Sequence, residues 1–364
     1  MKSVVNSFNE WDPLEEIIVG VLEGASNPPL EIGHIATLPA DLFELAREPD
    51  FRAWVQATGK PRQLTTDPDA YAAAQAALDG FVRVLEAAGV TVRRPDPIDH
   101  ARPYTTLDWS CAAGTGQSVP RDVLIVIGDE LLEAPMSWRS RYYEHLPYRR
   151  LIREYFRQGA RWTAAPKPQM TDELYDHGYQ RGKGWVTTEH EPVFDAADIA
   201  RFGKDLFVQR SHVTNQSGIE WLRRHLGPTY NVHAVEFADA RAMHIDATFV
   251  PLAPGKLLVN PERPIKQMPP MFERAGWQIL VAPPTAVPRT EGGENIYRWL
   301  HMNVLSLDEK RVIVEQDEVP LIRALEGWGF EPIPCSFRAF YPYGGSFHCA
   351  TCDVRRRGEL QSYF

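Results

Sequence analysis

Short apolar runs recur along the chain at positions that predict buried strands. Each contains three or four consecutive apolar residues and lies between polar or glycine-containing turns. The segments are Glu16–Gly20, Leu124–Gly128, Leu206–Val208, Leu257–Val259 and Val312–Val314. Continuous apolar runs of this length are typical of strands that are buried on both faces.

Each predicted strand is followed by an amphipathic segment, a glycine and a second strand-like run. The glycines are Gly89, Gly159, Gly227, Gly276 and Gly329, and the runs after them begin near Val90, Trp162, Tyr230, Gln278 and Glu331. A glycine directly after an amphipathic helix is typical of a C-terminal cap, because that position often needs a positive φ. We therefore predict five copies of one unit: strand, helix, glycine, strand.

Five such units predict a closed, five-fold α/β arrangement, in which each unit packs on its neighbours and ring closure removes exposed sheet edges. An open α/β sheet shows the same alternation of strands and helices. However, neither GxGxxG nor GxxxxGK[ST] follows the first strand, so a dinucleotide or P-loop site has little support. We expect one domain, residues 1–364, with long surface loops at 27–65, 175–185 and 283–295.

Composition narrows the class of partner. The 364-residue chain has 44% hydrophobic residues and a formal net charge of −9, and its basic residues are dispersed except at Arg355–Arg357. This pattern indicates neither a nucleic-acid surface nor a polybasic membrane patch. The N-terminus lacks an apolar signal core, and no apolar run reaches membrane-spanning length. We therefore expect a cytoplasmic protein that acts on small molecules.

The segment 344–358 holds the strongest candidate for chemistry. Gly344 and Gly345 allow the backbone to approach a ligand closely, and they precede Cys349. The positive field of Arg355–Arg357 is expected to favour the thiolate form of this cysteine. Cys349 is our candidate nucleophile.

Three other roles are open for the Cys349–Cys352 pair, which has CxxC spacing. A structural zinc site usually needs four ligands, but Cys111 and Cys335 are isolated, and the chain has no second CxxC or HxxxH. A thioredoxin-like dithiol normally lies after the first strand of a small domain, not near the C-terminus. Two buried, inert thiols are the third possibility.

Acids and a histidine that could assist a cysteine occur elsewhere in the chain. On an extended backbone the side chains of His244 and Asp246 would share one face. Asp195 and Asp198 supply another acid pair, and Asp122 stands at the mouth of a predicted strand. A histidine and an aspartate two residues apart are a weak signal without further context.

Several motifs together give the chain a specific resemblance. They include Asn9-Glu10-Trp11-Asp12-Pro13-Leu14, Phe194-Asp195-Ala196-Ala197-Asp198, Met243-His244-Ile245-Asp246, Asn260-Pro261-Glu262-Arg263-Pro264 and Phe347-His348-Cys349-Ala350-Thr351-Cys352. In these motifs the chain resembles the glycine amidinotransferase family over nearly its whole length. The resemblance implies the pentein fold, a five-bladed pseudo-symmetric α/β propeller, in agreement with the five predicted units.

The resemblance implies three catalytic residues. Cys349 is the expected nucleophile, which takes the amidino group of L-arginine as a covalent intermediate. His244 is the expected general acid and base, and Asp195 is the expected carboxylate that orients it. Thiolates are strong nucleophiles, and one imidazole can serve both halves of a ping-pong reaction.

Four substrate-binding residues are also implied by the resemblance. Asp122 and Asp246 are expected to bind the planar guanidinium through parallel charge-assisted hydrogen bonds. Arg263 is expected to bind the α-carboxylate, and Met243 to line the pocket. Metal and cofactor are not required. The expected partners are L-arginine and an acceptor amine such as glycine or lysine, and the family suggests a homodimer.

The residues expected to bind the acceptor amine differ from those of the glycine-using relatives. Arg241 replaces an asparagine, and Ile296 and Tyr297 replace a pair of serines. Arg241 either attracts a carboxylate or phosphate of the acceptor or is a solvated loop residue. The alternative functions are an arginine deiminase-like hydrolase and a non-catalytic arginine-binding pentein.

Overall fold

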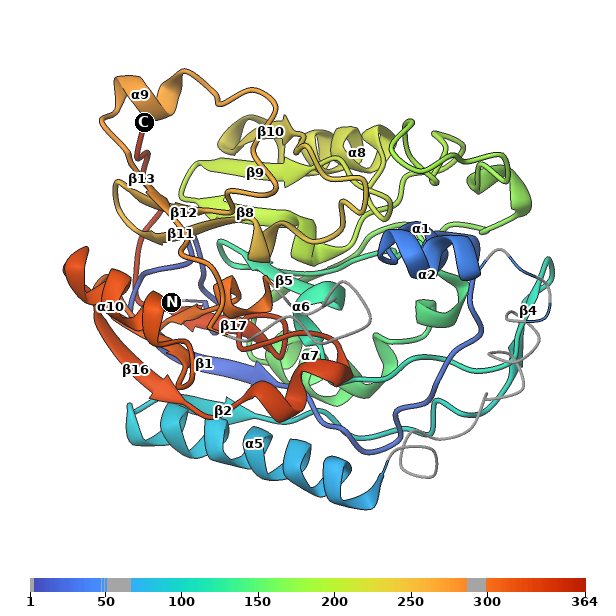
Figure 1. Cartoon of the computed structure of the whole chain (residues 1–364), viewed down its shortest axis with the longest axis horizontal. Coiled ribbons are helices and arrows are strands. Elements are labelled where there is room, and N and C mark those ends of the chain that lie inside the picture. The colour runs from blue at the N-terminus through green and yellow to red at the C-terminus, as the bar shows by residue number, and fades with distance from the viewer. Residues whose placement is uncertain (1–2, 47, 49, 51–66, 287–298) are drawn as a thin grey trace.

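The computed structural model describes residues 3–46, 48, 50, 67–286 and 299–364. Within these ranges five three-stranded sheets are grouped around a common centre (Figure 1). In each sheet the middle strand pairs antiparallel with one neighbour and parallel with the other. The predicted five-fold α/β arrangement is confirmed.

Four of the units share one order of elements along the chain, and in unit one the antiparallel strand comes last instead of first. Unit one consists of β1 (Leu14–Val19), α5 (Pro68–Ala87), β2 (Thr91–Arg93) and β17 (Thr351–Arg356), and unit two of β5 (Leu124–Ile127), β6 (Glu130–Glu133), α7 (Arg149–Arg157) and β7 (Arg161–Ala164). Unit three consists of β8 (Ile199–Phe202), β9 (Asp205–Gln209), α8 (Gln216–Leu226) and β10 (Asn231–Val235). Unit four consists of β11 (Phe249–Ala253), β12 (Lys256–Val259), α9 (Met271–Arg274) and β13 (Gln278–Val281), and unit five of β14 (Leu305–Ser306), β15 (Arg311–Glu315), α10 (Val319–Gly327) and β16 (Glu331–Cys335).

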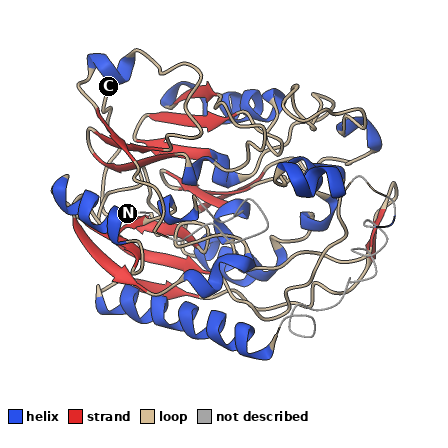
Figure 2. Ribbon diagram, viewed as in Figure 1, coloured by secondary structure: helices blue, strands red, loops and turns tan. Residues whose placement is uncertain are grey.

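The remaining elements lie in the connections between units. The helices are α1 (Ile32–Ala36), α2 (Ala40–Leu45) and α6 (Pro120–Val123), and β3 (Tyr104–Thr105) pairs with β4 (Ser110–Cys111). Short 3-10 turns are η1 (Arg139–Arg141), η2 (Leu146–Tyr148), η3 (Asp172–Leu174), η4 (Ala196–Asp198), η5 (Gly227–Thr229), η6 (Ile245–Ala247), η7 (Leu300–Met302) and η8 (Arg338–Tyr343). Figure 2 shows how much of the chain outside the sheets is loop. Helices α1 and α2 correct the prediction of an uninterrupted loop at 27–65, of which 47, 49 and 51–65 lie outside the described residues.

The glycine caps fall where the sequence predicts them. All five have positive φ: Gly89 (86°), Gly159 (99°), Gly227 (60°), Gly276 (69°) and Gly329 (88°). Each therefore reverses the chain between a helix and the outer parallel strand of its sheet. Figure 1 shows α5, α8 and α10 at the periphery of the molecule, outside the sheets.

The strand predictions need two corrections. Each unit has three strands rather than two, and the run predicted at Leu124–Gly128 is the antiparallel strand β5, whereas the middle strand of that unit is β6. Strand β6 begins and ends with buried glutamates, Glu130 and Glu133, so its sequence does not read as a continuous apolar run. Among the described helices none is long and apolar enough to cross a bilayer.

Helix α5 supports the segment that carries Cys349. Its buried positions Ala74, Leu78, Phe81 and Leu85 recur at helical spacing, and Asp67 caps its N-terminus through the backbone N–H of Asp69. The Phe81 ring centroid lies 5.1 Å from that of Phe347, two residues before the cysteine. Packing against one long helix therefore fixes the start of the turn that holds Cys349.

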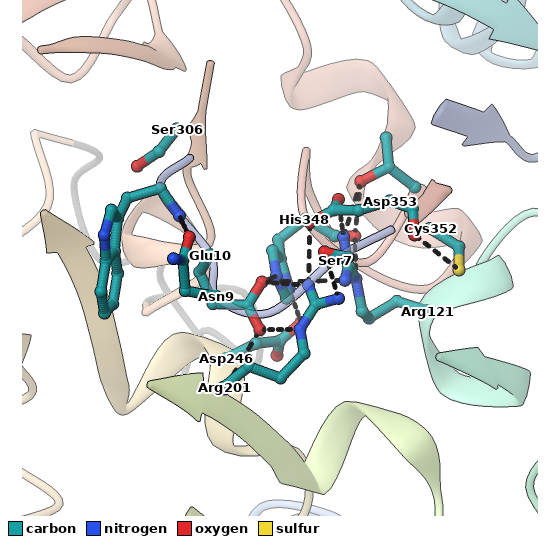
Figure 3. Close-up of polar contacts among 12 residues, drawn as sticks. Ser7, Asn9, Glu10, Arg121, Arg201, Asp246, Ser306, His348, Cys352 and Asp353 are labelled. Atoms are coloured by element: carbon teal, nitrogen blue, oxygen red, sulfur yellow. Dashed lines mark hydrogen bonds and ion pairs between the residues drawn. The ribbon is translucent and has the colours of Figure 1, made fainter. Parts of the chain in front are cut away.

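A cluster of buried ion pairs links segments that are far apart in the sequence (Figure 3). We call it the central cluster; its members are Glu10, Arg121, Arg201, Asp353 and Arg356, all buried. Arg201 donates to both oxygens of Glu10 (2.7 and 2.6 Å) and to Oδ2 of Asp353 (2.8 Å). Arg121 donates to Oδ1 of Asp353 at 2.6 Å, and Arg356 to Oδ2 at 2.7 Å. The cluster joins the N-terminal segment, α6, β8 and β17.

Candidate active site

One cavity of about 320 Å³ collects six of the seven predicted site residues. Its lining includes Asp122, Met243, His244, Asp246, Arg263 and Cys349. The seventh, Asp195, lies behind His244 and is buried. Residues that are up to 227 positions apart in sequence thus meet at one place. The folded chain brings the predicted set together.

Cys349 is presented by a tight turn immediately before β17. Gly344 and Gly345 have φ values of 123° and 150°, and a Cβ on Gly345 would lie 2.6 Å from Cys349 Sγ. A side chain at this position is therefore excluded, as expected from the paired glycines. The backbone N–H of Cys349 donates to Oδ1 of Asn303 at 3.0 Å, and its thiol donates to Oδ2 of Asp246 at 3.4 Å.

The positive field predicted from Arg355–Arg357 does not reach Cys349. Arg356 belongs to the central cluster, Arg355 donates to the carbonyl groups of Ser3 and Val4, and none of the three arginines lines the cavity. Burial, followed by the charges of Asp246 and Asp122, instead raises the pKa of Cys349 well above its usual value. This expectation was wrong because strand β17 carries the arginines away from the turn.

His244 stands at a strained position. Its φ is 59° and its ψ is 119°, and the 3-10 turn η6 (Ile245–Ala247) follows it. The extended backbone predicted for His244 and Asp246 is therefore wrong, although both side chains line the cavity. A positive φ in a non-glycine residue stores strain and is often found at functional sites.

Two carboxylates hold the imidazole of His244. Its Nε2 donates to Oδ2 of Asp195 at 3.1 Å, and its Nδ1 lies 3.6 Å from Oδ1 of Asp122. Burial acts to lower the pKa of His244, but the charges of Asp122 and Asp195 outweigh it and raise the pKa to about 10. The imidazole is therefore a cation at neutral pH, while Cys349 is a thiol.

Arg141 is a site residue that the sequence did not reveal. Its guanidinium donates to Oδ2 of Asp122 (2.9 Å), Oδ2 of Asp195 (3.3 Å) and Oε2 of Glu144 (2.8 Å). It therefore fixes two of the predicted carboxylates at once. Arg141 lies in the short turn η1, where neither periodicity nor a motif marks it.

Basic residues also line the cavity. Arg263 Nε lies 3.1 Å from Oδ2 of Asp239, whose Oδ1 accepts the backbone N–H of Arg241 at 2.9 Å. Both arginines line the cavity. Arg241 is therefore a pocket residue rather than a solvated loop residue. Ile296 and Tyr297, the other two acceptor-side positions, lie outside the described residues.

The two cysteines of the CxxC pair face different surroundings. Cys349 lines the cavity, whereas Cys352 is fully buried on β17 and its thiol donates to the carbonyl of Leu124 at 3.3 Å. All four cysteines are unpaired thiols. No group of three or more His, Cys, Asp or Glu side chains in the described ranges is arranged to hold a metal ion.

Comparisons with known proteins agree with this geometry. No family model matches the chain. It is 47% identical over 367 residues to an L-arginine:L-lysine amidinotransferase of Pseudomonas savastanoi pv. phaseolicola, covering 99% of this chain and 97% of that protein. It is 46% identical over 372 residues to the mitochondrial glycine amidinotransferase of Danio rerio, covering 99% and 85%.

A solved structure gives the same result for the fold. SxtG, an amidinotransferase of saxitoxin biosynthesis from Microseira wollei, superposes with a TM-score of 0.89 and 48% identity, covering 99% of this chain and all of that one. Such identity over almost the full length of both proteins does not arise from a shared fold alone. The chain therefore belongs to the amidinotransferase family and has its five-bladed pentein fold.

Proposed function

We propose that the protein transfers the amidino group of L-arginine to an acceptor amine and releases L-ornithine. The observation that carries the proposal is the shared cavity, whose lining combines a thiol, an imidazole and two carboxylates with Arg241 and Arg263. These acidic and basic groups match arginine, which has a guanidinium at one end and an α-carboxylate at the other. The full-length relatives that are named amidinotransferases support transfer as the reaction class.

In the first half-reaction, Asp122 and Asp246 bind the guanidinium and Arg263 binds the α-carboxylate. This arrangement holds the central guanidinium carbon against Sγ of Cys349. A bond forms between Sγ and that carbon while the bond from the carbon to Nε of arginine breaks. The products are an amidino-cysteine cation and ornithine.

Proton transfer follows from the charges of the free site. The guanidinium that enters between Asp122 and Asp246 replaces the positive charge that the imidazolium of His244 supplied, so His244 loses its proton to solvent. The neutral imidazole then accepts the thiol proton of Cys349 and passes it to the departing nitrogen. Asp195 keeps the ring oriented throughout.

In the second half-reaction the acceptor amine enters the space that ornithine has left. His244 removes a proton from the amine as its nitrogen attacks the amidino carbon, and the thiol is regenerated. Glycine, lysine and related amines are candidate acceptors, and Arg241 is positioned in the cavity wall to contact an anionic group on them.

We further propose that residues 1–364 form a single domain that works in the cytoplasm as a homodimer, without a bound metal or organic cofactor. The pairing of β1 with β17, which joins segments far apart in the sequence, supports a single domain. Light scattering after size-exclusion chromatography measures the oligomeric state directly.

A single-turnover reaction with arginine and no acceptor tests the function. The acid-quenched protein is analysed by mass spectrometry and the small products by chromatography. One equivalent of ornithine, with an amidino adduct on Cys349, supports transfer. Continuous formation of citrulline and ammonia would make the protein a hydrolase, and no product at all would leave only arginine binding.

A further inference from the structure

His348, the residue before the nucleophile, lies between the active site and the central cluster. Its Nδ1 is 2.8 Å from Oδ2 of Asp246, and its Nε2 is 3.3 Å from Oε2 of Glu10 (Figure 3). The ring is buried, with 9% of the residue exposed. Both ring nitrogens therefore face carboxylate oxygens, which accept hydrogen bonds but do not donate them when ionised.

This geometry requires a protonated ring. A neutral imidazole carries one N–H, whereas two donated hydrogen bonds need two. Burial, the largest effect, and the nearby charge of Arg121 act to lower the pKa of His348, but the hydrogen bonds to Asp246 and Glu10 raise it above the usual value. The backbone of His348 is also held: its carbonyl accepts from Nε of Arg121 at 3.3 Å and from Oγ1 of Thr351 at 2.9 Å.

The oxygen of Asp246 that His348 contacts also faces the nucleophile. Oδ2 of Asp246 accepts both the imidazole N–H and the thiol of Cys349. The side-chain amide of Asn303 holds the backbone of the same residue, donating to the Asp246 carbonyl at 3.2 Å. Burial acts to raise the pKa of Asp246, but His348 outweighs it and the pKa is lowered. His348 thus fixes both the orientation and the negative charge of this carboxylate.

Behind His348 the charges alternate in sign. Asp246, His348, Glu10, Arg201 and Asp353 follow one another in contact, each paired with an opposite charge. The chain of contacts runs from the cavity to strands β8 and β17. Movement of Asp246 would therefore disturb ion pairs in the centre of the propeller.

We propose that His348 is a positioning residue of the amidino transfer reaction, whose imidazolium holds Asp246 in the orientation that grips the guanidinium of arginine. The proposal rests on the proposed function only for the identity of that ligand. His348 does not line the cavity, so it acts on the substrate through Asp246.

A double-mutant cycle on arginine binding tests this role. Dissociation constants are measured by calorimetry in a Cys349→Ser background, which prevents chemistry, with His348→Gln, Asp246→Asn or both added. We expect His348→Gln to weaken binding about tenfold. We expect the double variant to bind no more weakly than Asp246→Asn alone, because His348 acts through Asp246. Unchanged affinity for His348→Gln, or fully additive losses, would overturn the proposal.

Two controls separate positioning from a general loss of structure. His100→Gln removes another buried histidine, which contacts Oε1 of Gln117 outside the cavity, and should leave arginine affinity unchanged. A second measurement needs no His348 variant. NMR of the protein labelled with ¹⁵N-histidine should show the signal of a doubly protonated ring at pH 8, and this signal should persist in His244→Asn. Absence of that signal would refute the imidazolium bridge. The proposed function is tested separately by ornithine release from the wild-type protein, because the double-mutant cycle measures only the affinity for arginine.

Discussion

Two groups of buried carboxylates lie close together in this protein and differ in how their charges are balanced. In the central cluster, both oxygens of Glu10 and of Asp353 accept hydrogen bonds from arginine. In the active site, Oδ1 of Asp122 and Oδ1 of Asp195 are buried and accept none from the residues that the structure describes. In the first group every carboxylate oxygen is paired with an arginine, whereas the second group has carboxylate oxygens left to bind a cationic ligand.

The pKa values of Glu10, Asp353 and Asp122 follow the same division. Burial acts to raise the pKa of all three carboxyls. At Glu10 the charge of Arg201 outweighs burial and lowers the pKa, and at Asp353 three arginines do the same. At Asp122 burial prevails over His244 and Arg141, and the pKa is raised. A balanced cluster stabilises the fold, whereas an acid-rich one favours binding of a cation at some cost in folding stability.

The largest effect on activity is expected from the nucleophile. Cys349→Ala should abolish ornithine release from arginine, because no other cysteine lines the cavity, while folding and arginine binding persist. Chromatography of single-turnover reactions measures the product. Cys352→Ser is the matched control and should retain turnover. Ornithine release by Cys349→Ala near the wild-type rate would refute the assignment.

The largest effect on folding is expected in the central cluster. Asp353→Asn leaves Arg121, Arg201 and Arg356 without their shared counter-charge, so the free energy of unfolding should fall by about 3–5 kcal/mol. Urea denaturation measures this loss. Asp129→Asn, which removes an exposed acid 3.6 Å from Arg161, should change stability by less than about 0.5 kcal/mol. Equal stabilities for the two variants would contradict the role given to the cluster.

An aspartate-to-asparagine substitution in the active site should instead weaken the binding of arginine. Asp122→Asn removes one charge from the guanidinium site, so arginine should bind about 10- to 100-fold more weakly, equivalent to about 1.5–3 kcal/mol for a hydrogen bond to a charged group. Its free energy of unfolding should fall less than that of Asp353→Asn, since burial already disfavours the ionised form of Asp122. Calorimetry and urea denaturation measure the two quantities. The distinction between the clusters fails if both variants lose equal stability.

The smallest expected effect of a substitution, a few-fold change in rate, is that of Asp122→Asn on the reactivity of Cys349. Because burial, Asp246 and Asp122 raise its pKa well above the usual value, the thiolate fraction of the free enzyme is small at pH 7 and grows as pH rises. Alkylation by iodoacetamide, followed by mass spectrometry, should therefore accelerate about tenfold per pH unit up to at least pH 9. Asp122→Asn should react a few-fold faster at a given pH. A rate that is constant between pH 6 and 8 would instead indicate a preformed thiolate.

The sequence predicted the parts of the fold that have local signals. Apolar runs and glycine caps identified the five units, because burial and helix termination each leave a short-range pattern. Strand β17 was missed because Thr351, Cys352, Asp353 and Arg356 make it polar although it is buried. Its charges are neutralised by residues that are distant in sequence, which hydropathy does not detect.

The contacts between site residues were also not predictable from local sequence. The resemblance supplied the identity of seven residues, and the cavity brings six of them together. The contacts of Arg141 and His348 with Asp122 and Asp246 exist only in the folded chain, since nothing in their local sequence indicates a partner. The arginine triplet illustrates the opposite error: proximity in sequence to Cys349 did not become proximity in space.

The pairing of β1 with β17 has a consequence for the order in which activity appears during synthesis. Leu14–Val19 is translated long before its antiparallel partner Thr351–Arg356. The first sheet is therefore completed only after the other four units have been translated, through contacts of very high sequence separation. Because Cys349 directly precedes the closing strand, a nascent or truncated chain has no positioned thiol. If Cys349 is the nucleophile, amidino transfer is therefore expected to begin only after β17 has paired with β1.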